Sequence, residues 1–63
     1  MDMPAQTRVY EETYRGVRII AEAHGNRWEA WAEGSGVRTR LHDTRDDAVS
    51  ELRRYFDEYA DRR

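Results

Sequence analysis

The spacing of apolar residues changes once along this 63-residue chain, and the change limits the folds that the chain can adopt. Before residue 43, apolar and polar residues alternate, as they do in a strand of which one face is buried. After residue 43, apolar residues recur every three or four positions, which is the pattern of an amphipathic helix. The sequence therefore predicts a sheet followed by one helix that covers it.

Glycine-containing turns divide the alternating part into strands. "VRIIAEAH" (17–24) and "RWEAWAE" (27–33) flank Gly25-Asn26, a pair that tolerates the positive φ of a two-residue hairpin. "GSG" (34–36) predicts a second turn, which leads into a third strand, "VRTRL" (37–41). The sheet is therefore expected to be an antiparallel meander.

The helix has its own start and stop signals. Thr44 is the predicted N-cap, and Asp47 three residues later completes a variant of the capping box. Asp46 and Asp47 suit the positive N-terminus of a helix, and Arg62 and Arg63 suit its C-terminus.

Together these elements predict an α+β fold, a three-stranded antiparallel β-meander packed on one C-terminal α-helix. Residues 8–14, "RVYEETY", are rich in β-formers and would add a fourth strand if they pair. We expect residues 1–7 to form a flexible tail and residues 8–63 a single domain. The predicted core comprises Val17, Ile19, Ala21, Trp28, Ala30, Val37, Leu41, Ala48, Leu52, Tyr55, Phe56 and Tyr59.

Composition narrows the class of protein. The absence of cysteine excludes disulfides and cysteine-based zinc sites. All eleven basic residues are arginine, against thirteen acidic residues, for a net charge of −2. An all-arginine set suits planar, bidentate contacts with carboxylates, phosphates or bases, but codon bias in a GC-rich genome is the favoured explanation of this composition. Neither a signal peptide nor a membrane-length apolar run is present, so we expect a cytoplasmic protein without a membrane partner.

No set of residues in the sequence is typical of an enzyme. The two serines, Ser35 and Ser50, lie outside nucleophile motifs, and the "GSG" turn lacks the lysine of a phosphate loop. His24 and the pair His42-Asp43 do not have the spacing of a zinc site. We therefore expect a non-catalytic protein with no metal and no cofactor.

One helix leaves the other face of the sheet uncovered, and that face is the candidate binding surface. Trp31, an aromatic flanked by arginines, has the composition of a binding hot spot. Two structural alternatives remain open: Trp31 packs against the N-terminal segment near Val9 or Tyr10, or the strand register shifts by one and Trp31 joins the core. The predicted partner-binding residues are Arg18, Ile20, Glu22, Glu29, Trp31, Arg38 and Arg40.

The stretch "YRGVR", with "RWEAWAE", "GVRTRL" and "DTRDDAV", is similar to the plant ethylene-response-factor (APETALA-type) DNA-binding domain and its bacterial and phage-integrase relatives. The likeness runs from about Tyr14 to Ala60. It implies a three-stranded sheet, backed by one helix, whose arginines and tryptophans read bases in the major groove. Glu33 and Arg40 depart from that pattern, standing where an arginine and a tryptophan are expected. The implied nucleic-acid set is Arg15, Arg18, Trp31, Arg38 and Arg40. A weaker resemblance is to small antitoxin domains of the HicB type.

Two functions are therefore in competition. The absence of catalytic motifs, the negative charge and the exposed aromatic favour a small protein-binding module, such as an inhibitor, an antitoxin or a phage-type accessory factor. Such a module would dock onto another protein through the uncovered sheet face or an acidic helix face. The alternative is a DNA-binding domain that uses the sheet arginines. A homodimer is possible, and in the DNA-binding alternative it would pair edge strands.

Overall fold

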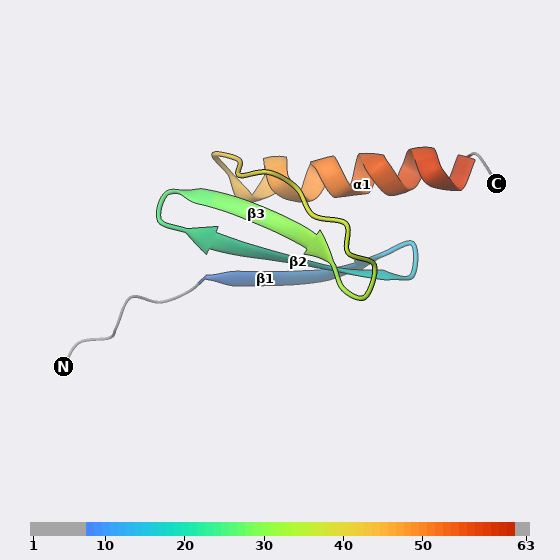
Figure 1. Ribbon diagram of the computed structural model, residues 1–63, viewed down its shortest axis with the longest axis horizontal. Helices are drawn as coiled ribbons and strands as arrows, with labels where there is room; N and C mark the ends of the chain where they lie inside the picture. The colour runs from blue at the N-terminus through green and yellow to red at the C-terminus, as the bar shows by residue number, and fades with distance from the viewer. Residues whose placement is uncertain (1–7, 62–63) are drawn as a thin grey trace.

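The computed structural model describes residues 8–61, with side chains up to Tyr59. The predicted tail at 1–7, and Arg62 and Arg63 at the predicted helix end, lie outside the described residues. The elements follow the order β-β-β-α (Figure 1): β1 (Val9–Tyr14), β2 (Val17–His24), β3 (Arg27–Ala32) and α1 (Arg45–Asp61).

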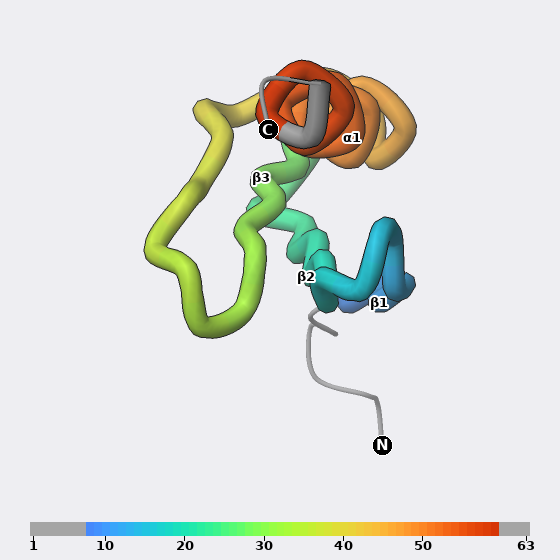
Figure 2. Tube along the Cα trace, turned by 90° about the vertical axis from the view of Figure 1, so that its right-hand side faces the viewer, coloured from blue at the N-terminus to red at the C-terminus, as the bar shows by residue number. Residues whose placement is uncertain are grey.

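The three strands form one antiparallel sheet in the order β1-β2-β3, and α1 lies across one face of it. The end-on view shows α1 above β3, with β1 at one edge of the sheet and the chain that links β3 to α1 at the other (Figure 2). The predicted α+β fold, a three-stranded antiparallel meander with one C-terminal helix, is confirmed.

Residues 8–14, which the sequence offers as a possible additional strand, supply β1. The strand pairs with β2 along its whole length, from Val9 opposite Glu22 to Tyr14 opposite Val17. The turn between the two strands is Arg15-Gly16, and φ is 54° at Arg15 and 80° at Gly16. Positive φ at both central residues is what a type I′ hairpin requires, and Gly16 adopts it without steric cost. "YRGVR" is thus a tight hairpin turn.

The segment after β3 differs from its prediction as a regular strand. It meets β3 at two isolated bridges, Trp31 with Arg38 and Trp28 with His42. These bridges enclose one more residue on the segment than on β3, which is the geometry of a β-bulge. Residues 37–42, the bulged segment, therefore follow the edge of β3 without continuing the predicted alternation.

The bulge changes the direction of the side chains that follow it. Thr39 is only 7% exposed, and its hydroxyl accepts a hydrogen bond from the Ala30 N–H at 3.1 Å and donates one to the Arg40 carbonyl at 2.7 Å. Leu41 is 45% exposed, so its assignment to the core was wrong. An extra residue reverses the inward and outward positions beyond it, because the side-chain period of a strand is two.

The core lies between α1 and the strands β2 and β3. Six side chains form its centre, and four of them are alanine or valine, which lets the helix backbone approach the sheet closely: Ile19, Ala21, Ala30, Ala48, Val49 and Leu52. Thr44 caps the helix as predicted, since its Oγ1 accepts a hydrogen bond from the Asp47 N–H at 3.0 Å. Tyr55 and Tyr59, predicted as core, are exposed instead and stack on each other with ring centroids 5.2 Å apart.

The contrast between two leucines gives a test of the core. Leu52 is 1% exposed and Leu41 is 45% exposed. We expect Leu52→Ala to lower the free energy of unfolding by about 3 kcal/mol, because it removes buried apolar volume and leaves a cavity. A domain of this size has only about 3–5 kcal/mol of stability in total, so the variant should keep at most about 2 kcal/mol and unfold at much lower urea concentrations than the wild type.

Leu41→Ala makes the same chemical change at an exposed position and should cost less than about 1 kcal/mol. Urea unfolding followed by far-UV circular dichroism measures both variants. Equal losses at the two positions would contradict the placement of the core and of the bulge.

Candidate functional site: the open sheet face

The side of the sheet that faces away from α1 is called the open face here. Strand alternation assigns its residues, because side chains that lie between the buried positions of a strand point to the other face. The open face carries Val9, Glu11 and Thr13 from β1, Arg18, Ile20, Glu22 and His24 from β2, Arg27, Glu29 and Trp31 from β3, and Arg38 from the bulged segment.

Ile20 and Trp31 form the apolar centre of this face. They are Cα partners on neighbouring strands, and both are half-buried. The Arg38 guanidinium lies over the Trp31 ring, 5.0 Å from its centroid, in a cation–π contact. The register places Trp31 on the open face, so the alternative in which a one-residue shift moves it into the core is excluded.

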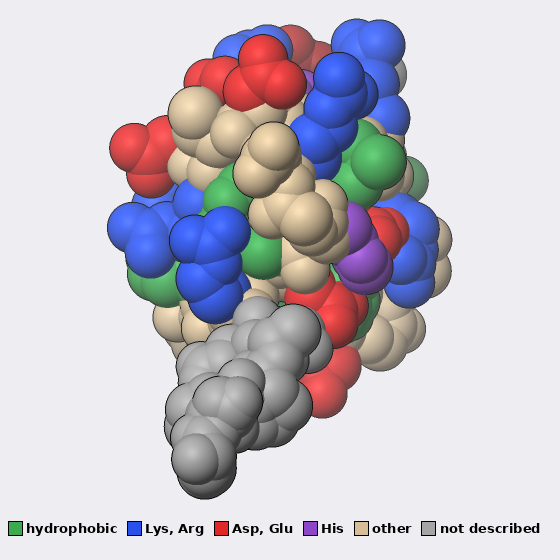
Figure 3. All heavy atoms as spheres, turned by 90° about the vertical axis from the view of Figure 1, so that its left-hand side faces the viewer, with side chains coloured by type: hydrophobic (Ala, Val, Ile, Leu, Met, Phe, Trp, Pro, Cys, Tyr) green, Lys and Arg blue, Asp and Glu red, His purple; other side chains and the backbone are tan. Residues whose placement is uncertain are grey.

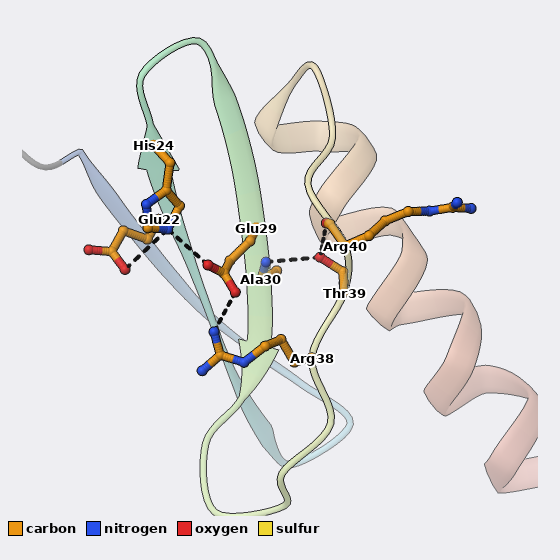
Figure 4. A network of polar contacts seen from close by, with 7 residues as sticks. All are labelled: Glu22, His24, Glu29, Ala30, Arg38, Thr39 and Arg40. Atoms are coloured by element: carbon orange, nitrogen blue, oxygen red, sulfur yellow. Dashed lines mark hydrogen bonds and ion pairs between the residues drawn. The ribbon is translucent and has the colours of Figure 1, made fainter.

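Glu29 is the centre of the charge network on this face. It is only 16% exposed and pairs with the Arg38 guanidinium and, at 2.8 Å, with Nε2 of His24. The same His24 nitrogen lies 3.7 Å from Glu22. Figure 4 shows these four side chains converging on one side of the sheet.

The other arginines of the open face also have acidic partners. Arg18 donates to Glu11 at 2.5 Å and lies 3.6 Å from Glu33, and Arg27 lies 3.8 Å from Asp43. Charges of both signs are also interspersed on the end of the molecule that carries the β2–β3 turn, rather than collected into one basic patch (Figure 3). The guanidinium groups of the open face are thus already engaged with carboxylates of the chain.

Two residues predicted for a binding surface lie elsewhere. Arg15 lies in the β1–β2 turn, and its Nε donates to Asp57 of α1 at 2.7 Å. Arg40 extends toward α1, away from Glu29 and Arg38 (Figure 4), because the extra residue of the bulge reverses the direction of its side chain. It lines a surface hollow of about 310 Å³ together with His42, Asp47, Ser50, Glu51 and Arg54.

The structure therefore brings together most of the predicted partner-binding residues but fewer of the nucleic-acid residues. Arg40 is the single exception in the partner-binding set, and its predicted place beside Arg38 was wrong. From the nucleic-acid set, Arg15 and Arg40 are absent from the open face, and Arg18, Trp31 and Arg38 remain on it.

A polar seam between β1 and α1, which sequence reasoning missed, positions the edge of the sheet. Arg53 of α1 donates to both carboxylate oxygens of Glu12, at 2.8 and 2.6 Å, and the Tyr10 hydroxyl donates to Glu12 at 2.7 Å. The Tyr14 hydroxyl donates to Asp57 at 2.7 Å. The only sequence signal is the spacing: Tyr10, Glu12 and Tyr14 lie two apart, so a strand through them puts all three on one face.

This seam shifts the titration of its carboxylates. The bidentate bond from Arg53 lowers the pKa of Glu12. The pKa of Asp57 is lowered by the hydrogen bond from Tyr14 and then by that from Arg15. The hydrogen bond to Glu12 in turn raises the pKa of Tyr10.

The remaining titratable groups do not assemble a metal site within residues 8–61. Nε2 of His42 lies 2.6 Å from Glu51, and no group of three or more potential ligands gathers in this range. Over the same residues, α1 is neither long enough nor apolar enough to cross a membrane.

Comparisons with protein-family models, with curated proteins and with solved structures found no match. The resemblance to ethylene-response-factor domains, and the weaker one to HicB-type antitoxins, therefore remain predictions from the sequence.

Acid unfolding tests the seam. A carboxylate whose pKa is lower in the folded protein than in the unfolded chain stabilises the fold above the unfolded pKa, and this stability is lost as the pH falls through the folded pKa. We expect the free energy of unfolding to fall between about pH 5 and pH 2, and to fall less steeply in Glu12→Gln.

Arg53→Met should flatten the same part of the pH profile, because it removes the largest cause of the lowered pKa of Glu12. In the Arg53→Met background, Glu12→Gln should then have little further effect on the slope. Urea unfolding at several pH values gives these slopes, and equal effects of Glu12→Gln in the two backgrounds would show that the pair is uncoupled.

Proposed function

We propose that this chain is a non-catalytic protein-binding module that docks through its open face, of the kind represented by small inhibitors, antitoxins and phage-type accessory factors. The observation that carries the proposal is the apolar pair Ile20 and Trp31, which lie side by side on an uncovered sheet and are surrounded by charged residues. A central aromatic anchor with a polar rim is the usual anatomy of a protein interface.

The charge pattern supports a protein partner over DNA. Each arginine of the open face is paired with a carboxylate, and Glu11, Glu22, Glu29 and Glu33 add negative charge along the sheet. Affinity for DNA depends on cations that neutralise phosphates and release counterions. An arginine that already holds a carboxylate would have to break that pair first, and the remaining glutamates would repel the phosphates.

The open face is also a better candidate than the acidic side of the helix. Glu51 pairs with His42, and Asp57 accepts hydrogen bonds from Tyr14 and Arg15, so both acids serve contacts within the domain. The acidic side of α1 therefore lacks a continuous set of unengaged carboxylates among the residues with described side chains.

Trp31→Ala tests the docking surface. We expect an affinity-tagged chain to capture a partner from a lysate of the cells that make it, and Trp31→Ala to lose that partner, because truncation of a central aromatic anchor costs about 2 kcal/mol or more. Tyr59→Ala is the matched control, since Tyr59 is an aromatic residue of α1 that is 57% exposed. A partner that Trp31→Ala retains at the wild-type level would place the interface elsewhere.

DNA binding through Arg18, Trp31 and Arg38 is the competing function, and a gel-shift titration with mixed-sequence duplex DNA separates it from the proposal. We expect no shift even at low salt. A shift that weakens steeply with salt, and that Arg18→Ala with Arg38→Ala abolishes, would support DNA binding instead.

A further inference from the structure

Four side chains form a row across the open face in an order that is complementary to itself. Glu11 on β1 lies opposite Ile20 on β2, Ile20 lies opposite Trp31 on β3, and Trp31 is bridged to Arg38 of the bulged segment. Read across the sheet, the row is acid, aliphatic, aromatic, base. When the row is placed against a second copy of itself in the reverse order, the acid faces the base and the aliphatic residue faces the aromatic one.

We propose that the partner of the open face is a second copy of this chain, an inference that rests on the proposed function of that face. The two copies pack face to face about a two-fold axis that runs parallel to the strands, between β2 and β3. This rotation places β2 over β3 of the second copy and β1 over its bulged segment, and each row faces the same row of the second copy. Glu11 then faces Arg38 of the second copy, and Ile20 meets Trp31 of the second copy, each contact occurring twice.

The next row has the same polarity. Glu33 follows β3 and continues its pairing, because the Glu33 N–H donates to the Arg18 carbonyl at 2.9 Å. The same rotation places Arg18 over Glu33 of the second copy. Two neighbouring rows are thus complementary. Packed sheets cross at about 30°, and the long arginine and glutamate side chains at the ends of the rows can span the resulting offset.

The neighbouring row on the side away from Arg18 contains Glu22 and Glu29, and its like charges disfavour this dimer. This row therefore limits where the contact can be centred. Glu22 and Glu29 are Cα partners, and the rotation places Glu22 over Glu29 of the second copy. Glu29 already holds the guanidinium of Arg38, which reduces the repulsion. The contact is therefore centred on the row of Ile20 and Trp31 and extends toward Arg18.

Pairing of two copies through the edge of β1 fits the residues less well. In such a dimer the two β1 strands run antiparallel, and a two-fold axis normal to the sheet pairs only residues whose side chains point to the same face. Two registers centred on the middle of β1 satisfy this condition. One places Glu11 opposite Glu11 of the second copy, and the other places Glu12 opposite Glu12. Like charges directly opposite each other destabilise strand pairs, and charged residues commonly protect edge strands in this way.

Charge reversal in the full chain tests the face-to-face dimer. The wild type should sediment as a dimer that dissociates on dilution. Glu11→Arg alone opposes two arginines at each end of the row, and Arg38→Glu alone opposes two glutamates. Each variant should raise the dissociation constant at least about tenfold, as expected when close charge pairs are lost.

An equimolar mixture of the two variants should restore the dimer. In the mixed dimer, one copy carries arginine at both ends of its row and the other copy carries glutamate at both ends, so every contact between row ends again joins opposite charges. Glu58→Arg is the control for Glu11→Arg: it makes the same change of charge at an exposed position of α1, and this variant should dimerise like the wild type. Circular dichroism checks that each variant is folded.

The failures of the two proposals can be told apart. A wild type that remains monomeric up to about millimolar concentration, or a mixture that stays monomeric, would overturn self-association. If a captured partner is still lost in Trp31→Ala, docking through the open face would survive that result. If the dimer forms as expected but Trp31→Ala retains the captured partner, self-association stands. Only the docking of another protein through the open face would then be refuted.

Discussion

One helix can bury only one face of a sheet, and the division of this molecule into a core and an open face follows from that limit. On β2, Ile19 and Ala21 are fully buried, whereas Arg18, Ile20 and Glu22 alternate with them and point away. The alanines of the sheet and Ala48 of α1 keep the covered side thin. The chain therefore buries its core on the helix side of the sheet. The other side, formed by the three strands and the bulged segment, stays exposed.

Arginine is used to hold the edges of this thin core together. Arg53 spans from α1 to Glu12 of β1, and Arg15 closes the hairpin turn onto Asp57. Two further guanidinium groups, those of Arg8 and Arg45, lie over the rings of Trp28 and Tyr10. Planar groups with several donors suit such contacts better than lysine would. These four arginines thus contact carboxylates or aromatic rings of the same chain.

Periodicity alone predicts β2, β3 and α1, because each buries one continuous stripe, and Thr44 predicts the helix start. The bulged segment is where that reasoning fails. An inserted residue does not disturb the alternation of "VRTRL", so Arg40 and Leu41 were assigned to the wrong sides. The β2 and β3 part of the open face could be predicted from the alternation of its residues, whereas Val9, Glu11 and Thr13 were missed because the alternation in residues 8–14 is imperfect and did not fix their pairing. The seam could not, because it depends on contacts between residues about forty positions apart, such as Glu12 with Arg53.

The pairing of charges on the open face has a consequence for any partner. A contact with Arg18 or Arg38 must either replace Glu11 and Glu29 or accept them along with the arginines. A partner that presents the same alternation of acids and arginines accepts them at the lowest desolvation cost, since each ion pair gains a second neighbour of opposite sign and no charge is left buried alone. A second copy meets this condition along the two rows that contain Trp31 and Arg18. A different protein that binds the same face must therefore offer a similar mixed surface, and under the proposed self-association it would compete with a second copy for Trp31.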